Sequence, residues 1–165
     1  MMNDNKGQLA LATVALISAG ALVTVVVLQY LFGLPPCDLC YLQRVPYLLN
    51  LVMSVLGMMP VVALHEKRNI LMYCGFLFIL SVVFSGYHVG VEELWWAGPD
   101  SCSGGGILSM EGLAAALNQS AQPSCQEPAA QLFGISIAGY NFITSAVLAG
   151  FCFWGVQLKI WWNKQ

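Results

Sequence analysis

Four long runs of apolar residues, separated by polar connections, dominate this chain. Residues 8–34 carry no charged side chain, and about 20 apolar residues suffice to cross the hydrocarbon core of a bilayer. Because this run continues through bulky residues to Phe32, we expect a retained helix and not a cleaved signal peptide. The full pattern predicts four membrane spans, at about residues 9–32, 45–64, 70–91 and 140–158.

The connections between these spans differ in length and character. Residues 33–44 give a short loop, residues 65–69 a compact polar turn, and residues 92–139 a long loop rich in Gly, Pro and Ser. Inside the long loop, apolar positions recur at helical spacing over residues 107–117, which predicts a short helix lying at the membrane interface. We therefore expect an all-α membrane protein: one domain, built as a four-transmembrane-helix bundle with one short and one long external loop.

Composition and charge support this class and orient the bundle. The chain is 58% hydrophobic and only 8% charged, which excludes an ordinary soluble domain, and no basic patch offers a surface for nucleic acid. Five of the six basic residues lie on one side of the predicted membrane, which is assigned to the cytoplasm together with both termini: Lys6, Lys67, Arg68, Lys159 and Lys164. The exception is Arg44, whose external position needs a local explanation.

The segment LPPCDLCYLQRVP, residues 34–46, offers that explanation. If a helix starts near Pro36, which suits a first helical position, then Cys37, Cys40 and Arg44 share one face. A helix N-terminus and a neighbouring arginine both stabilise a thiolate and make a Cys-x-x-Cys pair reactive. The pattern indicates a redox site at the membrane surface.

The six cysteines separate by position. Cys74 and Cys152 fall inside predicted spans, where a free cysteine behaves as a small hydrophobic residue. The other four face the outer compartment: Cys37, Cys40, Cys102 and Cys125.

Structural disulfides, a metal site and covalent haem are the alternatives to redox chemistry for the outer cysteines. Structural disulfides are one alternative, but a bridge between Cys37 and Cys40 closes a very short loop and stabilises weakly. Zinc sites made of four cysteines usually come from two closely spaced pairs, and covalent haem needs His where Tyr41 stands. Redox chemistry is favoured, and a membrane scaffold with structural disulfides or a thiolate metal site remains the alternative.

The pattern as a whole resembles the disulfide bond formation protein B (DsbB) family. The resemblance rests on the four spans, on Cys37-Asp38-Leu39-Cys40 followed by Arg44, on Cys102 and Cys125 in the long loop, and on Leu-Phe-Gly at 132–134. It implies an enzyme of the bacterial inner membrane, a thiol:quinone oxidoreductase with periplasmic cysteines. Such proteins reoxidise a periplasmic DsbA-like thiol oxidase and pass electrons to ubiquinone or menaquinone, which keeps the periplasm oxidising.

The resemblance also implies an order for the thiol exchange. The partner's thiolate would attack Cys102 of a Cys102–Cys125 bridge, and Cys125 would then attack Cys37 and release Cys40. Cys40 is the expected donor to quinone.

Two residues are expected to bind the quinone, and no metal is expected. Arg44 could hold a quinone carbonyl near the outer interface. His88, about one turn from the outer end of the third span, lies at a similar depth, although a histidine hydrogen-bonded at the interface would look the same. Gln43 is a weaker candidate.

Overall fold

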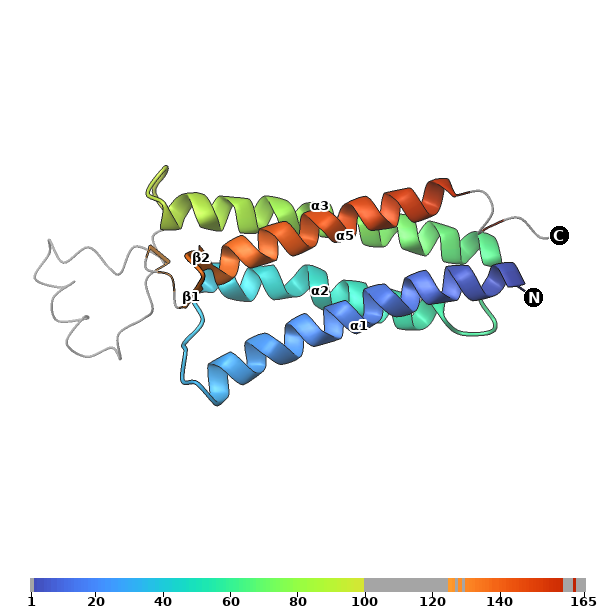
Figure 1. Ribbon diagram of the computed structural model, residues 1–165, viewed down its shortest axis with the longest axis horizontal. Helices are drawn as coiled ribbons and strands as arrows, with labels where there is room; N and C mark the ends of the chain where they lie inside the picture. The colour runs from blue at the N-terminus through green and yellow to red at the C-terminus, as the bar shows by residue number, and fades with distance from the viewer. Residues whose placement is uncertain (1, 100–124, 127, 129, 159–161, 163–165) are drawn as a thin grey trace, which may run out of the picture.

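A computed structural model describes residues 2–99, 125–126, 128, 130–158 and 162, and within these residues it shows a bundle of long helices (Figure 1). The helices are α1 (Met2–Tyr30), α2 (Asp38–Gly57), α3 (Leu64–Glu92) and α5 (Ile137–Gln157). All four are long and apolar enough to cross a membrane, which confirms the predicted four-helix membrane bundle. A two-stranded antiparallel hairpin, β1 (Gln131–Leu132) and β2 (Ile135–Ser136), leads directly into α5.

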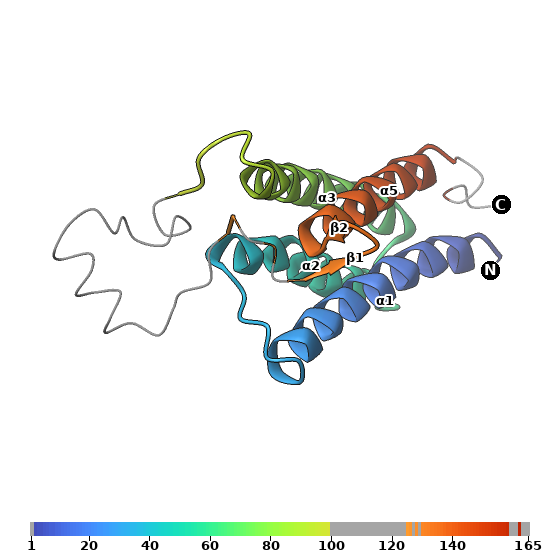
Figure 2. The ribbon, with the colours of Figure 1, turned by 60° about the vertical axis from the view of Figure 1, so that its left-hand side comes forward.

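The helices do not pack equally closely along their length. α3 and α5 lie side by side, and α2 packs against both α1 and α3 (Figures 1 and 2). The start of α1 and the end of α5 lie at the same end of the bundle, as four spans require. Toward its C-terminal end α1 diverges from the other helices, so the bundle is loosest at the end that carries the Cys-x-x-Cys segment.

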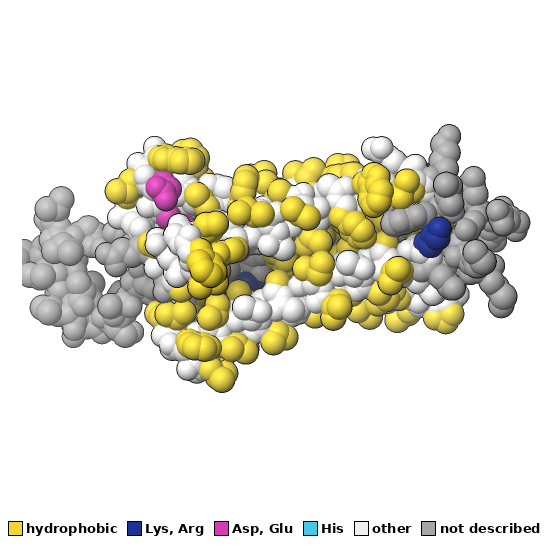
Figure 3. Space-filling model, in the orientation of Figure 1, with side chains coloured by type: hydrophobic (Ala, Val, Ile, Leu, Met, Phe, Trp, Pro, Cys, Tyr) yellow, Lys and Arg dark blue, Asp and Glu magenta, His cyan; other side chains and the backbone are white. Residues whose placement is uncertain are grey.

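The surface of the bundle matches its predicted environment. Hydrophobic side chains cover the middle of the face seen in Figure 3, whereas acidic groups lie near the end of α3 and a basic group lies at the opposite end. Large apolar side chains that are well exposed include Leu16 on α1 and Val147 on α5. A surface of this kind is stable in lipid, where it faces no water.

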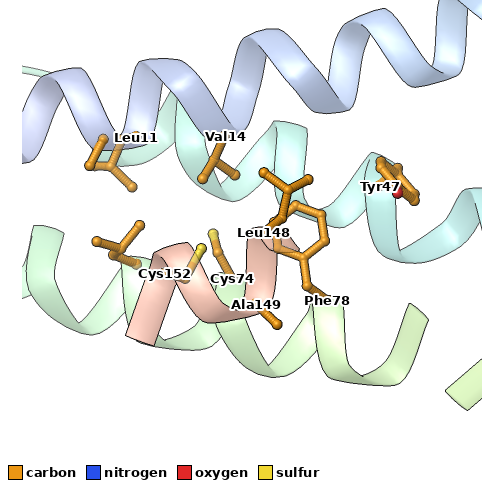
Figure 4. Close-up of a cluster of buried hydrophobic side chains, with 10 residues drawn as sticks. Leu11, Val14, Tyr47, Cys74, Phe78, Leu148, Ala149 and Cys152 are labelled. Atoms are coloured by element: carbon orange, nitrogen blue, oxygen red, sulfur yellow. The ribbon is translucent and has the colours of Figure 1, made fainter. Parts of the chain in front are cut away.

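The core between the helices is small and tightly packed. Leu11, Val14, Tyr47 and Phe78 are buried there with other apolar side chains (Figure 4). Cys74 and Cys152 are completely buried in the same cluster, in agreement with their prediction as packing residues.

The helix α2 differs in extent from the predicted second span, 45–64. α2 begins at Asp38 and not at residue 45, and it ends at Gly57 and not at residue 64. The prediction began the span after Arg44 because a charged side chain is costly in lipid. In the structure Gln43 and Arg44 both line an internal cavity, so their polarity does not end the helix.

Of two local predictions near the helix ends, one agrees with the structure and one needs correction. The helix that carries the cysteine pair starts near Pro36, as expected, with Cys37 as its N-cap. The polar residues 65–68 form the first turn of α3 and not a turn between helices. Residues 58–63 connect α2 to α3 instead, and Pro60 lies in this connection, after the end of α2.

The external loops are described only in part. The hairpin before α5 was not predicted; it turns through Phe133 and Gly134, whose φ angles of 52° and 78° are those of the tight turns that join antiparallel strands. The predicted interfacial helix at residues 107–117 and Cys102 both lie outside the described residues.

Gly90 near the end of α3 is required by packing, because a Cβ there would lie 2.0 Å from the ring of Trp96.

Candidate functional site

Cys37 caps the N-terminus of α2. Its backbone is extended (φ −79°, ψ 171°), and its Sγ accepts a hydrogen bond from the backbone N–H of Cys40 at 3.4 Å. The Sγ atoms of Cys37 and Cys40 lie 2.9 Å apart, and both thiols are free. A sulfur at a helix N-cap faces unpaired N–H groups and the positive end of the helix dipole, so this position stabilises a thiolate.

His88 reaches the same sulfur from α3. Its Nε2 lies 3.6 Å from Cys37 Sγ, and the imidazole is 3% exposed. The hydrogen bond from the Cys40 thiol, together with the contact to His88, outweighs the effect of burial and lowers the pKa of Cys37 to about 4. Cys37 is therefore the thiolate of the reduced pair, and Cys40 is its hydrogen-bond donor.

A carboxylate lies directly behind the histidine. Glu92 Oε1 is 3.7 Å from His88 Nε2, one helical turn further along α3. Ser136, the N-cap of α5, donates to the other carboxylate oxygen at 2.5 Å and so links the ends of α3 and α5. These contacts fix Glu92 beside the cysteine pair.

The other side of the imidazole is held by a pair of amides. His88 Nδ1 lies 2.6 Å from the side-chain amide nitrogen of Gln43, and Asn141 Nδ2 donates to Gln43 Oε1 at 2.6 Å. From Asn141 the hydrogen bonds continue to Ser145, at 3.1 Å, and from there to Tyr47. Three helices are joined in this way, and the orientation of the ring facing Cys37 is set.

Arg44 does not contact the thiols through any hydrogen bond of the described residues. Its Nη1 donates to Gln29 Oε1 on α1 at 2.9 Å, and its guanidinium lies over the ring of Tyr41 at 4.7 Å. Arg44 Nε is buried and has no hydrogen-bond acceptor among these residues. A buried N–H without a partner is costly, by about 1–3 kcal/mol, and indicates a site that a ligand oxygen could satisfy.

The cysteine pair and Arg44 share one cavity. It has a volume of about 570 Å³ and lies between α1, α2, α3 and α5, where α1 diverges from the bundle. Its walls are mainly apolar, with polar groups contributed by four side chains in particular: Gln43, Arg44, His88 and Asn141. An apolar cleft with a few convergent polar groups is typical of a site for a small ring-shaped ligand.

The remaining described cysteine lies against the same pair. Cys125 is 1% exposed and disulfide-bonded, and it belongs to one buried cluster with Cys37, Leu39 and Val91, against which Cys40 also packs. A sulfur from the long external loop is thus in place beside the Cys-x-x-Cys pair, although Cys37 and Cys125 are far apart in the sequence.

Comparison with known proteins identifies the family of the chain. The family model described as "Disulfide bond formation protein DsbB" matches residues 7–155, which is most of the chain. The chain belongs to the DsbB family. It is also similar to an uncharacterized protein, RP370, of Rickettsia prowazekii (strain Madrid E), with 31% identity over 145 residues that cover 85% of this chain and 80% of that protein. No solved structure is a significant match.

DsbB-family membership makes the chain a multi-pass membrane protein of disulfide bond formation. The structure brings together five of the six residues singled out from the sequence: Cys37, Cys40, Arg44, His88 and Cys125. It does not describe Cys102. It also places beside them residues with no predicted role, among them Gln29, Glu92 and Asn141. Gln29 and Asn141 could have been noticed as polar side chains within otherwise apolar helices.

The low pKa of Cys37 leads to a measurable pH profile. A thiolate persists above its pKa, so the reduced pair should show thiolate absorbance that is constant from about pH 8 down to about pH 5 and falls only near pH 4. The measurement is ultraviolet absorbance of reduced protein in detergent, with the Cys37→Ser variant subtracted. His88→Leu should move the midpoint upward. A wild-type midpoint near that of an ordinary cysteine would contradict the assignment.

Proposed function

We propose that this DsbB-family protein is a thiol:quinone oxidoreductase that reoxidises a periplasmic DsbA-like thiol oxidase. The observation that carries the proposal is the burial of Cys125 against Cys37, because it brings a disulfide of the external loop into reach of the Cys-x-x-Cys pair. The same pair opens on an apolar cavity that Arg44 also lines, and Arg44 Nε is buried with no hydrogen-bond partner in the described part of the chain. The disulfide of the external loop therefore lies next to the Cys37–Cys40 pair, and this pair lies next to the cavity.

The exchange steps follow from the chemistry of thiolates. A thiolate of the reduced partner attacks Cys102 of a Cys102–Cys125 bridge, forming a mixed disulfide and releasing Cys125 as thiolate. Cys125 attacks Cys37 of the oxidised Cys37–Cys40 bridge and releases Cys40. The partner's second thiolate then attacks the partner sulfur of the mixed disulfide, releases Cys102 as thiolate and leaves as an oxidised pair. Cys102 attacks Cys125 of the Cys37–Cys125 bridge, which restores the loop disulfide and leaves Cys37 and Cys40 reduced.

The environment of Cys37 favours electron flow in this direction. A disulfide is a stronger oxidant when its reduced form is stabilised, and the helix N-cap, the Cys40 thiol and His88 all stabilise the Cys37 thiolate. Cys125 packs against this pair. The reduced state is thus expected to accumulate at Cys37 and Cys40.

The cavity fits a quinone, either ubiquinone or menaquinone. Its volume of about 570 Å³ and its apolar walls suit a substituted ring, and Arg44 Nε offers a buried donor for a carbonyl oxygen. Arg44 and His88 line the cavity and would hold the quinone, with the imidazole already oriented by Gln43. A quinone held there would supply the acceptor for the two electrons of the reduced pair, with one proton coming from Cys40 and the other from solvent.

We also propose that the site faces the periplasm and that both termini are cytoplasmic. The cysteine pair lies at the end of the bundle that carries Glu92 and Glu93, whereas Lys67 and Arg68 lie at the opposite end, at the start of α3. Cytoplasmic loops carry the excess of basic residues in inner-membrane proteins. The external end is the one that a soluble thiol oxidase can reach.

The proposal is tested by turnover of the purified protein. The full chain in detergent is supplied with a reduced DsbA-like protein and a soluble quinone analogue, and quinol and partner disulfide are both measured. One quinol should form for each disulfide. A protein that serves only as a disulfide-stapled scaffold would show no turnover, which would reject the proposal.

Arg44→Met should weaken quinone binding selectively. Loss of a hydrogen bond from a charged donor costs about 1.5–3 kcal/mol, so we expect KM for the quinone analogue to rise about tenfold to a hundredfold. Thiol exchange between Cys125 and Cys37 should be unaffected. The measurement is steady-state turnover at varied quinone concentration.

Arg68→Met is a matched control for this variant. Arg68 is also an arginine of a membrane-spanning helix, but its Nε donates to the carbonyl of Val156 at the other end of the bundle. Its replacement should leave the KM for quinone unchanged. An unchanged KM in Arg44→Met, or an equal rise in both variants, would remove Arg44 from the proposed quinone site.

A further inference from the structure

The cysteine pair and His88 form a second kind of site. Cys37 Sγ, Cys40 Sγ and His88 Nε2 all lie within 4.8 Å of one another. The thiols are free, and Glu92 Oε1 stands 3.7 Å from the same imidazole nitrogen. Two sulfurs and one imidazole nitrogen are ligand types that zinc takes in proteins, and the Glu92 carboxylate beside the imidazole is a fourth ligand type of this kind.

The distances are close to those that zinc requires. With Zn–S bonds of about 2.3 Å and Zn–N bonds of about 2.0 Å, a tetrahedral ion separates a sulfur from a nitrogen by about 3.5 Å and two sulfurs by about 3.8 Å. The Cys37 Sγ to His88 Nε2 distance of 3.6 Å already fits. The two sulfurs, at 2.9 Å, must separate by about 1 Å. Cys40 is partly exposed and faces the cavity, so its side chain has room to rotate.

The second nitrogen of the imidazole has an amide side chain beside it. Histidine ligands of metals usually donate their other N–H to a neighbouring acceptor, which fixes the ring. His88 Nδ1 lies 2.6 Å from the Gln43 amide. Rotating the Gln43 and Asn141 amides together would present the Gln43 oxygen to Nδ1–H and keep their mutual hydrogen bond. His88 Nε2 is then free to bind an ion.

We propose that the reduced Cys37–Cys40 pair and His88 bind a thiophilic divalent cation, with zinc as the fitting ion, and that binding arrests the enzyme. Zn²⁺ takes the place of the one proton that the reduced pair carries, on Cys40; this proton leaves to solvent, and no electron is transferred. Glu92 or a water molecule completes four ligands. Because both sulfurs are then bound to the ion, neither can form a disulfide until the ion leaves. The binding of zinc does not depend on the proposed function, whereas the arrest of turnover rests on it.

The chemistry of the donors sets the class of ion. Thiolate sulfur selects soft or borderline ions, whereas Mg²⁺ and Ca²⁺ require oxygen ligands. The oxidised pair has no thiolate to offer, so binding should report the redox state of the pair. The site would therefore make the reduced enzyme, and not the oxidised enzyme, sensitive to zinc.

The experiment measures binding to the full chain in detergent, in a Cys102→Ser, Cys125→Ser background that removes the other outer thiols. Reduced protein should bind one equivalent of Zn²⁺, and Co²⁺ should give a thiolate-to-metal charge-transfer band. Oxidised protein should bind none. Cys37→Ser and Cys40→Ser should abolish binding, and His88→Gln should weaken it at least about tenfold. Equal binding to oxidised protein, or undiminished binding in Cys37→Ser, would overturn the proposal.

Controls separate this site from the buried cysteines and from misfolding. Cys74→Ser and Cys152→Ser alter two thiols buried in the bundle core and should leave zinc binding intact; loss of binding in both would place the ion elsewhere. X-ray absorption of the zinc-loaded wild-type chain needs no variant. It should show two sulfurs at about 2.3 Å and a nitrogen at about 2.0 Å, and a shell without sulfur would overturn the site.

A separate readout tests the arrest. In wild-type protein turning over with reduced partner and quinone analogue, added Zn²⁺ should stop turnover and a chelator should restore it. Continued turnover with zinc bound would overturn the arrest. Because equilibrium binding uses neither quinone nor partner, a chain that binds zinc but never turns over would refute the proposed function alone, and a chain that turns over without binding zinc would refute this inference alone.

Discussion

Replacing either Cys37 or Cys40 by Ser should reduce quinone-linked turnover by at least about a thousandfold, because loss of a covalent nucleophile removes the reaction path itself. Each residue has its own step: Cys37 accepts the attack of Cys125, and Cys40 is the thiolate then released beside the cavity. A serine hydroxyl can do neither. The measurement is quinol formation with reduced partner by each variant.

Cys74→Ser is the matched control for this result. Cys74 is as buried as any residue of the core, and its Sγ lies 3.6 Å from Ser54 Oγ, so a serine there keeps a hydrogen-bond partner. Its turnover should remain near that of the wild type. If Cys40→Ser retained turnover while Cys37→Ser did not, a Cys37–Cys125 disulfide alone would serve, and the role given to Cys40 would be wrong.

The second large effect concerns the external loop. A Cys102→Ser, Cys125→Ser variant should lose turnover driven by a DsbA-like protein by at least about a hundredfold, since it lacks the disulfide that the partner attacks. Turnover driven by a small dithiol should persist, because Cys40 is partly exposed at the cavity and a small molecule can reach it. The same preparation is assayed with both electron donors.

The two donors make the order of the relay visible. Loss of turnover with both would mean that the loop disulfide holds the Cys37–Cys40 pair in place, which its shared burial would explain. Full turnover with both would mean that the partner attacks the Cys-x-x-Cys pair directly and that the loop has no part in the exchange. The proposed sequence of steps is supported if turnover with the protein donor is lost while turnover with the small dithiol persists.

The site also explains why an arginine lies in a helix that crosses the membrane. Arg44 is satisfied by Gln29 and by the ring of Tyr41, and it faces a cavity and not lipid. An intramembrane charge is tolerated when it is paired or lines a cavity. The Nε of Arg44 is buried and has no hydrogen-bond partner among the described residues, and it is the donor that a ligand in the cavity would use under the proposed function.

The sequence by itself determined the class of protein and the chemistry of its most reactive pair. Four uncharged apolar runs require membrane helices, since a backbone in lipid must satisfy its own hydrogen bonds. The spacing of Cys37 and Cys40 placed both sulfurs at the start of a helix. These features are local, because the run of apolar residues and the helical spacing of the cysteines can both be read from a short stretch of sequence.

Only the tertiary structure decided which groups surround that pair. His88 meets Cys37 across 51 residues of sequence, Asn141 reaches Gln43 from α5 across 98 residues, and Cys125 is buried beside both cysteines. The sequence also left open whether Gln43 and Arg44 face lipid or a cavity, because that depends on how four helices pack. Packing of apolar helices is set by side-chain fit between distant segments, and no local pattern records it.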